Sequence, residues 1–189
     1  WSFASYGNWL IATNFTNAVQ VLKDIPAGVA FEVLAGAPPL ARFVIANNNR
    51  IILIHTNDGT EYPRRVQWCA LENPIDWVQA PLTTGADYQD IADIDGTLIG
   101  AVPYDDGFLA FSQNDIARFT PSGNSYIYII HTFKKSIGTI SNSSIVSTVK
   151  GVFYWANDDI FLYNEAVSSV PISVGYGVRK TLFGYLNTQ

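Results

Sequence analysis

One hairpin pattern occurs twice in this chain, and it constrains the fold more than any other feature. Residues 107–119 read GFLAFSQNDIARF and residues 151–163 read GVFYWANDDIFLY, and they align without a gap at an offset of 44 residues. Each stretch has a glycine, a mostly apolar run, a polar turn and a second short apolar run. A period of roughly 40–50 residues built from hairpins is typical of propeller blades. The repeat therefore predicts an all-β scaffold or binding platform.

Strand-like runs of β-branched and aromatic residues recur along the chain, separated by Gly, Pro, Asn and Asp. The runs that begin near positions 9, 51, 108 and 152 are equivalent, and we expect them to be the inner strands of the blades. We predict a β-propeller or part of one over residues 1–189, with about four blade-like units of antiparallel strands. The chain is expected to be a segment of a longer polypeptide, because it lacks methionine and begins inside a strand-like run. An irregular β-sandwich is the alternative architecture.

Two intervals depart from this strand pattern. Residues 71–95 are predicted to be an inserted loop between blades, because they lengthen one spacing between equivalent strands. Residues 178–186 give the best helix candidate, since one helical face would carry Val178, Leu182, Tyr185 and Leu186. A short helical turn is also expected at Asn73–Trp77.

The charge balance argues against nonspecific binding to nucleic acid. The net charge is −5, only 14% of the residues are charged, and no basic run exceeds two residues. Contact with DNA through a neutral channel remains compatible with this balance. A surface so poor in charge also suits burial against neighbouring subunits. No apolar run approaches the ~18 residues of a membrane span, and none is predicted.

Residues capable of chemistry are present but do not form a recognisable active-site pattern. Cys69 is the single cysteine and is expected to be a buried thiol. His55 and His131, the only histidines, each end an apolar strand without a second ligand spaced nearby. The carboxylates fall in turn-like segments, namely Asp93-Ile94-Asp95-Gly96, Asp105-Asp106-Gly107, Asn114-Asp115 and Asn157-Asp158-Asp159. We therefore predict no enzyme activity, no catalytic residue, no cofactor and no metal. The alternative is an enzyme acting on polysaccharide, with Asp95 or Asp106 in a carboxylate pair.

The tryptophans support two different interpretations. Trp9, Trp68 and Trp155 fall on strands and are expected to pack between blades. Trp77 lies in a loop-like segment after Asn73-Pro74, where we expect it to anchor the insertion or a neighbouring subunit. Exposed aromatics on one propeller face would instead form a platform for a host glycan.

Residues 7–95 carry a series of short motifs in a fixed order. The motifs are GNWLIATN at 7–14, AGAPPLARF at 35–43, YPRRVQWC at 62–69, NPIDW at 73–77 and ADYQD at 86–90. In this order, they resemble the nozzle or packaged-DNA-stabilisation type of tail protein found in short-tailed bacteriophages. The resemblance covers about half of the chain. The chain departs from the family at Phe15, where a turn glycine is expected.

The resemblance implies both a function and an assembly. In that family a β-propeller sits below the portal, and six copies surround the DNA channel. The chain would then be a structural tail protein, assembled in the host bacterial cytoplasm, that retains packaged DNA and forms the conduit for its ejection. Its partners would be further copies in a homo-oligomeric ring, other tail or portal-adaptor proteins, and double-stranded DNA read without sequence recognition. Arg64, Arg65 and Trp77 are the predicted subunit contacts. The alternative function is a virion or bacterial propeller that binds a host surface glycan or receptor.

Overall fold

The computed structural model describes residues 1–25, 27, 30–123, 127–134, 137–178 and 181, and these residues form an all-β fold. Sheet 1 consists of β1 (Ser2–Tyr6), β2 (Trp9–Thr13), β3 (Gln20–Leu22) and β4 (Glu32–Val33). Sheet 2 consists of β5 (Leu40–Asn47), β6 (Arg50–Asn57), β7 (Glu61–Trp68) and β8 (Asp87–Asp90). Sheet 3 consists of β9 (Leu98–Tyr104), β10 (Gly107–Ser112), β11 (Asp115–Pro121) and β12 (Tyr128–Lys134). Sheet 4 consists of β13 (Ile145–Thr148), β14 (Gly151–Trp155), β15 (Ile160–Tyr163) and β16 (Ile172–Ser173), and a short 3-10 turn, η1 (Asn142–Ser144), precedes it.

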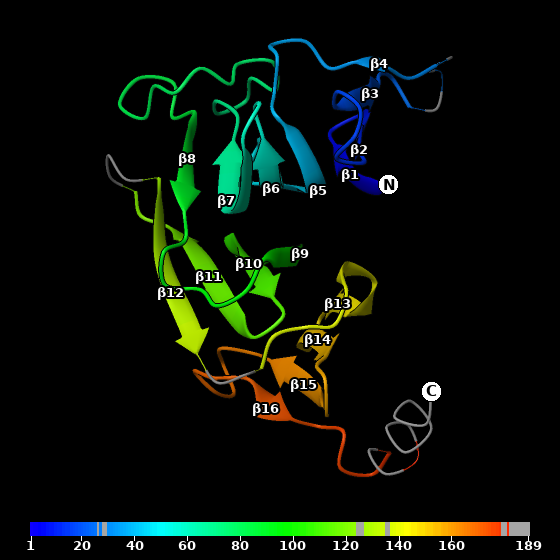
Figure 1. The fold of residues 1–189 in the computed structure, drawn as a ribbon, viewed down its shortest axis with the longest axis vertical. Helices are drawn as coiled ribbons and strands as arrows, with labels where there is room; N and C mark the ends of the chain where they lie inside the picture. The colour runs from blue at the N-terminus through cyan, green and yellow to red at the C-terminus, as the bar shows by residue number, and fades with distance from the viewer. Residues whose placement is uncertain (26, 28–29, 124–126, 135–136, 179–180, 182–189) are drawn as a thin grey trace.

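Each sheet is a simple antiparallel meander in which the chain order equals the spatial order. The first strands contact one another in succession, β1 with β5, β5 with β9, and β9 with β13. Figure 1 shows the result as an arc of four sheets, with the first strands toward its open side and the fourth strands outside. The prediction of four antiparallel, blade-like units is therefore confirmed, and their arrangement is propeller-like.

The prediction that the equivalent runs are the inner strands of the blades was wrong, because each run is the second strand of its sheet. The runs near residues 9, 51, 108 and 152 are β2, β6, β10 and β14, which are the second strands of their sheets. The first strands lie inside them. The second strands have a strong sequence signal because each is flanked by strands on both edges, and β6 and β10 are also buried on both faces. β6 is the extreme case, since Arg50 to Thr56 are all buried.

The hairpin repeat seen in the sequence is a structural repeat. Residues 107–119 form β10 and β11, and residues 151–163 form β14 and β15. Phe108 faces sheet 2, and its equivalent, Val152, faces sheet 3 in the same way. The repeat thus fixes which residues meet the preceding sheet and which meet the following one.

Three apolar layers hold the arc together, one between each pair of consecutive sheets. Ile11, Val21 and Leu53 belong to the layer between sheets 1 and 2. Ile54 and Phe108 belong to the layer between sheets 2 and 3. The layer between sheets 3 and 4 is built by Leu109, Phe111, Ile116, Val152, Tyr154 and Tyr163. Strand alternation supplies both faces of a sheet, so one strand contributes to two layers.

The interval 71–95 contains more structure than the inserted loop expected there. Its last part includes β8, which pairs with β7 and completes sheet 2. Residues 71–86 form the connection, and Asn73–Trp77 within it adopts turns without a helix. The helix predicted for 178–186 lies largely outside the described residues.

The glycine that opens each copy of the hairpin is required by close backbone packing. A Cβ atom added at Gly107 would lie 1.9 Å from the carbonyl oxygen of Phe119. A Cβ atom at Gly151 would lie 2.3 Å from the carbonyl oxygen of Tyr163, the residue equivalent to Phe119. Real Cβ atoms do not come so close to backbone atoms, so the third strand leaves room only for glycine.

We expect Gly107→Ala to lower the free energy of unfolding by about 1–3 kcal/mol, because the new methyl group must push β11 away from β10. Urea denaturation followed by tryptophan fluorescence would measure the change. Gly177→Ala is the matched control, since a Cβ there meets no atom within 4 Å. Equal effects of the two substitutions would contradict the steric explanation.

Candidate functional site

The motifs that carry the phage-tail resemblance converge mainly on sheet 2. The segment 35–43 leads into β5, the segment 62–69 contains most of β7, and the segment 86–90 contains β8. The turn at 73–77 lies against the first of these segments, because a Cβ added at Gly36 would be 1.8 Å from the carbonyl oxygen of Ile75. Four motifs separated in sequence therefore build one unit, which consists of sheet 2 and the connection 71–86.

The connection 71–86, called here the β7–β8 loop, is held by many hydrogen bonds. Ala70 N–H donates to the Asp76 carbonyl at 2.8 Å, and Leu71 N–H donates to the Thr84 carbonyl at 3.2 Å. The Gly85 carbonyl accepts from Arg50 Nη1 at 2.9 Å and from Trp68 Nε1 at 3.0 Å. These bonds join the loop to β6 and β7 and give it a defined shape.

Large apolar side chains project from this ordered loop into solvent. Val78 is 73% exposed and Leu82 is 78% exposed, and Leu71 and Ile75 are also exposed. Exposed apolar side chains grouped on an ordered segment are typical of a protein contact surface. The β7–β8 loop is therefore the strongest candidate in the described chain for contact with another protein.

Trp77 lies in this loop but does not share its exposure. Its side chain is 6% exposed and packs into the layer between sheets 1 and 2. Its Nε1 donates to the Pro74 carbonyl at 3.0 Å. Trp77 therefore anchors the loop from within, as expected of an insertion anchor, and its buried ring is closed to a glycan.

The two predicted contact arginines differ in their surroundings. Arg65 is buried, forms two 2.7 Å bonds to Asp90, and lies between the rings of Tyr62 and Tyr88 at 3.5 and 3.9 Å. It thereby joins β7 to β8. Arg64 is exposed, with Nε donating to the Gly96 carbonyl at 3.1 Å. The role of Arg64, Arg65 and Trp77 in subunit contacts stays a prediction, and Arg64 alone of the three presents its side chain to solvent.

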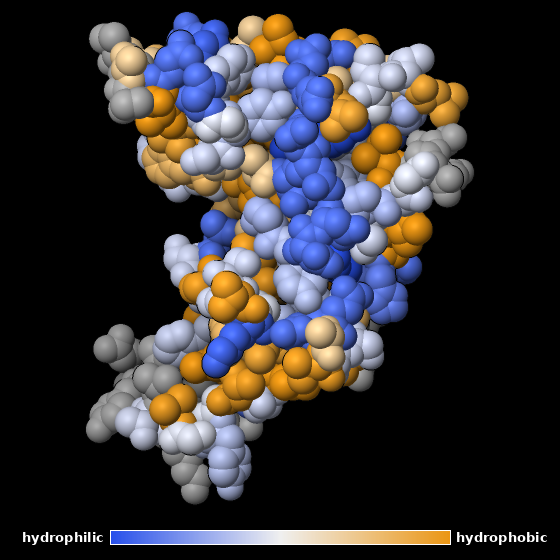
Figure 2. All heavy atoms as spheres, turned by 180° about the vertical axis from the view of Figure 1, so that it is seen from behind, coloured by the Kyte–Doolittle hydropathy of each residue, from blue (hydrophilic) through white to orange (hydrophobic). Residues whose placement is uncertain are grey.

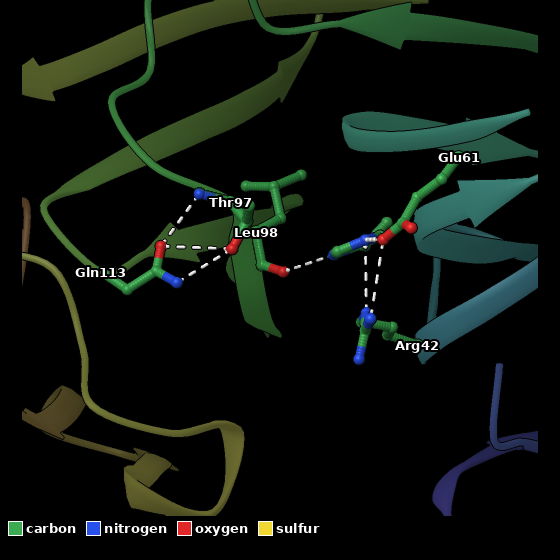
Figure 3. Close-up of polar contacts among 6 residues, drawn as sticks. Arg42, Glu61, Thr97, Leu98 and Gln113 are labelled. Atoms are coloured by element: carbon green, nitrogen blue, oxygen red, sulfur yellow. Dashed lines mark hydrogen bonds and ion pairs between the residues drawn. The ribbon is translucent and has the colours of Figure 1, made fainter.

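Figure 3 shows Arg42 and Glu61 of sheet 2 facing Leu98 of sheet 3. His55 lies between them and centres a polar cluster. Its Nδ1 lies 3.2 Å from the Leu98 carbonyl oxygen, and its Nε2 lies 2.5 Å from Glu61 Oε1. Arg42 approaches the same pair, with Nε 3.2 Å from His55 Nε2 and Nη2 3.5 Å from Glu61 Oε1.

The β6–β7 register shifts between Ile54 and Thr56, and His55 adopts a left-handed φ of 57°. Residues 63–65 of β7 lie opposite this irregularity, and Pro63 among them lacks the N–H that a regular ladder needs.

The cluster borders a polar cavity of about 360 Å³ lined by residues from all four sheets or their connections. Arg42 and Phe15 lie on one side of it, and Ser141, Asn142 and Ser143 lie on another. Phe15 adopts a φ of 67°, which explains why a glycine is expected at this position. Its ring lies 4.3 Å from the Arg42 guanidinium and packs edge-on against His55. His131, the second histidine, lies away from this cluster on β12, beside Phe133.

Three carboxylates of the predicted turns, those of Asp95, Asp106 and Asp115, are engaged within the chain. Asp115 is buried and accepts the Asp95 N–H at 2.8 Å, and Asp95 accepts from Asn114 at 2.8 Å. Asp106 pairs with the buried Arg118 at 3.3 Å. Within the described ranges, no three His, Cys, Asp or Glu residues gather in a way that would hold a metal ion. The contacts of these three carboxylates stabilise the turns.

Cys69 lies between sheets 1 and 2 and is buried. The Ile51 N–H points at its sulfur at 3.1 Å. Burial raises the pKa of the thiol to about 11. The thiolate is therefore scarce near neutral pH, which is the opposite of what a nucleophile requires.

Glu61 should make the stability of the protein depend on pH. The hydrogen bond with His55, together with the charge of Arg42, holds the pKa of Glu61 below its ordinary value of 4.5. The ionised carboxylate therefore stabilises the fold above pH 4.5, and this contribution is lost as the pH falls through the lowered pKa. We expect Glu61→Gln to be less stable than the wild type at pH 7 and this difference to shrink in acid. Urea denaturation at a series of pH values would measure it, and a difference independent of pH would show that the substitution acts through packing.

Cys69 should resist alkylation in the native protein. We expect iodoacetamide at pH 8 to leave the thiol unmodified in the folded chain and to modify it fully in urea, as measured by intact mass. Lys150→Cys, in an exposed turn, provides a reactive reference in the same fold. Equal alkylation rates at the two positions would contradict the burial of Cys69.

No helix in the described ranges is long and apolar enough to cross a membrane. When the sequence is compared with known proteins, no family model and no curated protein matches it.

Proposed function

We propose that this chain is a structural component of the tail of a short-tailed bacteriophage. In this proposal it assembles into a homo-oligomeric ring, with six copies suggested by the resemblance, next to other tail or portal-adaptor proteins. The ring retains packaged DNA and provides the conduit for its ejection. The protein works without an active site or a cofactor, in a virion assembled in the bacterial cytoplasm.

One observation carries the proposal. The motifs that resemble the tail-protein family build sheet 2 and the β7–β8 loop, and this loop displays Val78 and Leu82 to solvent. A hydrogen-bonded loop loses little conformational freedom on binding, so its exposed apolar side chains contribute efficiently to a contact. The motif-bearing unit is thus the part of the molecule best suited to hold subunits together.

The charge of the chain is compatible with a DNA conduit. A net charge of −5 leaves few cations to neutralise phosphates, so a duplex passing along the ring would be held weakly. A conduit requires this property, since tightly bound DNA would not slide. The glycan-binding alternative requires exposed aromatic side chains, and the burial of Trp77 counts against it.

We expect the full-length protein to form a six-fold ring at the tail of purified virions, with the β7–β8 loop at the contact between subunits. Electron microscopy with symmetry determination would measure this. Val78→Asp and Leu82→Asp should leave the fold intact and weaken ring assembly about tenfold or more, the effect of about 1.4 kcal/mol lost at one contact.

Val149→Asp is the matched control, because Val149 is exposed in the turn between β13 and β14, outside the motif-bearing unit. Its rings should assemble as in the wild type. A full-length protein that is strictly monomeric and absent from virions would overturn the proposal.

A further inference from the structure

The polar cavity beside Arg42, called here the inner cavity, is walled by segments that lie far apart in the sequence. Ser2 on β1, Arg42 on β5 and Ile99 on β9 line its volume of about 360 Å³. These are first strands, so the cavity lies on the concave side of the arc, which Figure 2 shows at mid-height from behind. The connection after β2 and the turn η1 add Asn14 and Asn142 to its walls. Polar side chains from separate parts of the chain thus converge on one space.

The two asparagines of the inner cavity are left with hydrogen-bond donors. Asn14 Oδ1 accepts the Thr16 N–H at 3.1 Å and the Asn17 N–H at 2.9 Å. Asn142 Oδ1 accepts the Ala101 N–H at 3.3 Å. An asparagine side chain has one acceptor oxygen and one NH₂ group, so these backbone contacts occupy the oxygen and leave the NH₂ group for a ligand.

The serines of the inner cavity are in the same position. Ser2 Oγ accepts the Val44 N–H at 3.1 Å, and Ser141 Oγ accepts the Ser143 N–H at 3.0 Å, so each hydroxyl keeps its hydrogen for donation. Among the described residues that line the cavity, no side chain is acidic. The lining therefore offers donors and lacks the carboxylate oxygens that a hard metal cation prefers.

Arg42 gives the inner cavity a positive charge that its neighbours do not cancel. His55 Nδ1 lies 3.2 Å from the Leu98 carbonyl oxygen, which only accepts, so Nδ1 carries a hydrogen. His55 Nε2 lies 2.5 Å from Glu61 Oε1, and a hydrogen must lie between these two atoms, because two lone pairs would repel at this distance. Whichever atom carries that hydrogen, the His55–Glu61 pair is neutral overall. The net charge of the cluster is therefore that of the Arg42 guanidinium.

The Arg42 guanidinium is held in place by the protein itself. It lies 4.3 Å from the centre of the Phe15 ring, and its Nη2 lies 3.5 Å from Glu61 Oε1. A side chain that is already fixed loses little conformational freedom when it binds a ligand. Within the described chain these contacts leave Nη1 as a donor, and a guanidinium is well suited to an oxyanion.

We propose that the inner cavity binds a phosphate group, as free phosphate or as part of a small phosphorylated compound. The donors of Arg42, Asn14 and Asn142 come from different walls, and the tetrahedral oxygens of phosphate can accept from several directions at once. The two oxygens of a carboxylate lie in one plane and would reach fewer of these donors. The cavity volume of about 360 Å³ lies within the range of about 300–1,000 Å³ of small-molecule sites. This inference is independent of the proposed function, which rests on the β7–β8 loop.

An NMR titration of the isotope-labelled chain tests the proposal, with inorganic phosphate, glycerol phosphate, glycerol and acetate as probes. Both phosphates should shift the side-chain amide signals of Asn14 and Asn142 and the Nε–H signal of Arg42. Asn48, whose Nδ2 donates to the Asp106 carbonyl, should not respond. Tighter binding of glycerol phosphate would identify a phosphorylated compound as the ligand, and equal affinity would identify free phosphate. Glycerol alone should not bind. The absence of phosphate binding, or acetate binding as tight as that of phosphate, would overturn the proposal.

Asn14→Asp is the sharpest substitution, because the new carboxylate still accepts from Thr16 and Asn17 but replaces the donors with a negative charge. It should weaken phosphate binding about tenfold or more, and Arg42→Gln should do the same. Lys150→Gln is the matched control, since it removes one positive charge in the exposed turn between β13 and β14, outside the cavity. Its phosphate affinity should equal that of the wild type, and circular dichroism would confirm that each variant is folded. Equal weakening by Lys150→Gln would show a response to overall charge and would overturn the proposal.

Discussion

The packing of one sheet against the next is the interaction on which the rest of this structure depends. A strand that alternates its side chains between two faces contributes to two apolar layers at once, and β6 and β10 are buried along both faces. Each layer removes apolar surface from water at roughly 25 cal/mol per Å², so stability grows with every sheet added.

Polar contacts have a different role, which is to hold the irregular parts in place. Arg65, between two tyrosine rings and bonded to Asp90, attaches the short edge strand β8 to β7. Arg50 and Trp68 bind the carbonyl of Gly85 and so fix the end of the β7–β8 loop. His55 and Glu61 occupy the place where the β6–β7 ladder is interrupted. These residues are engaged in building the scaffold.

The β7–β8 loop differs from these engaged residues, because it projects from sheet 2 with Val78 and Leu82 exposed to solvent. It belongs to the motif-bearing unit, in a chain in which only 14% of the residues are charged.

The sequence by itself determined the strand class, the four-unit repeat and most of the second and third strands, because these strands are apolar, long and flanked by turn residues. It also determined that Cys69 would be a buried thiol. The tertiary structure alone decided the outer strands β4, β8 and β16, which have two to four residues each and form through pairing to a third strand. It also decided that the runs beginning near residues 9, 51, 108 and 152 are the second strands of their sheets, and that Trp77 is buried. The hydrogen bond from Arg65 to Asp90, which are 25 positions apart in sequence, likewise depends on the tertiary structure. Local periodicity reports only whether a segment has an apolar face. Which partner covers that face depends on contacts between residues far apart in the chain, and a single sequence does not encode those contacts in any local pattern.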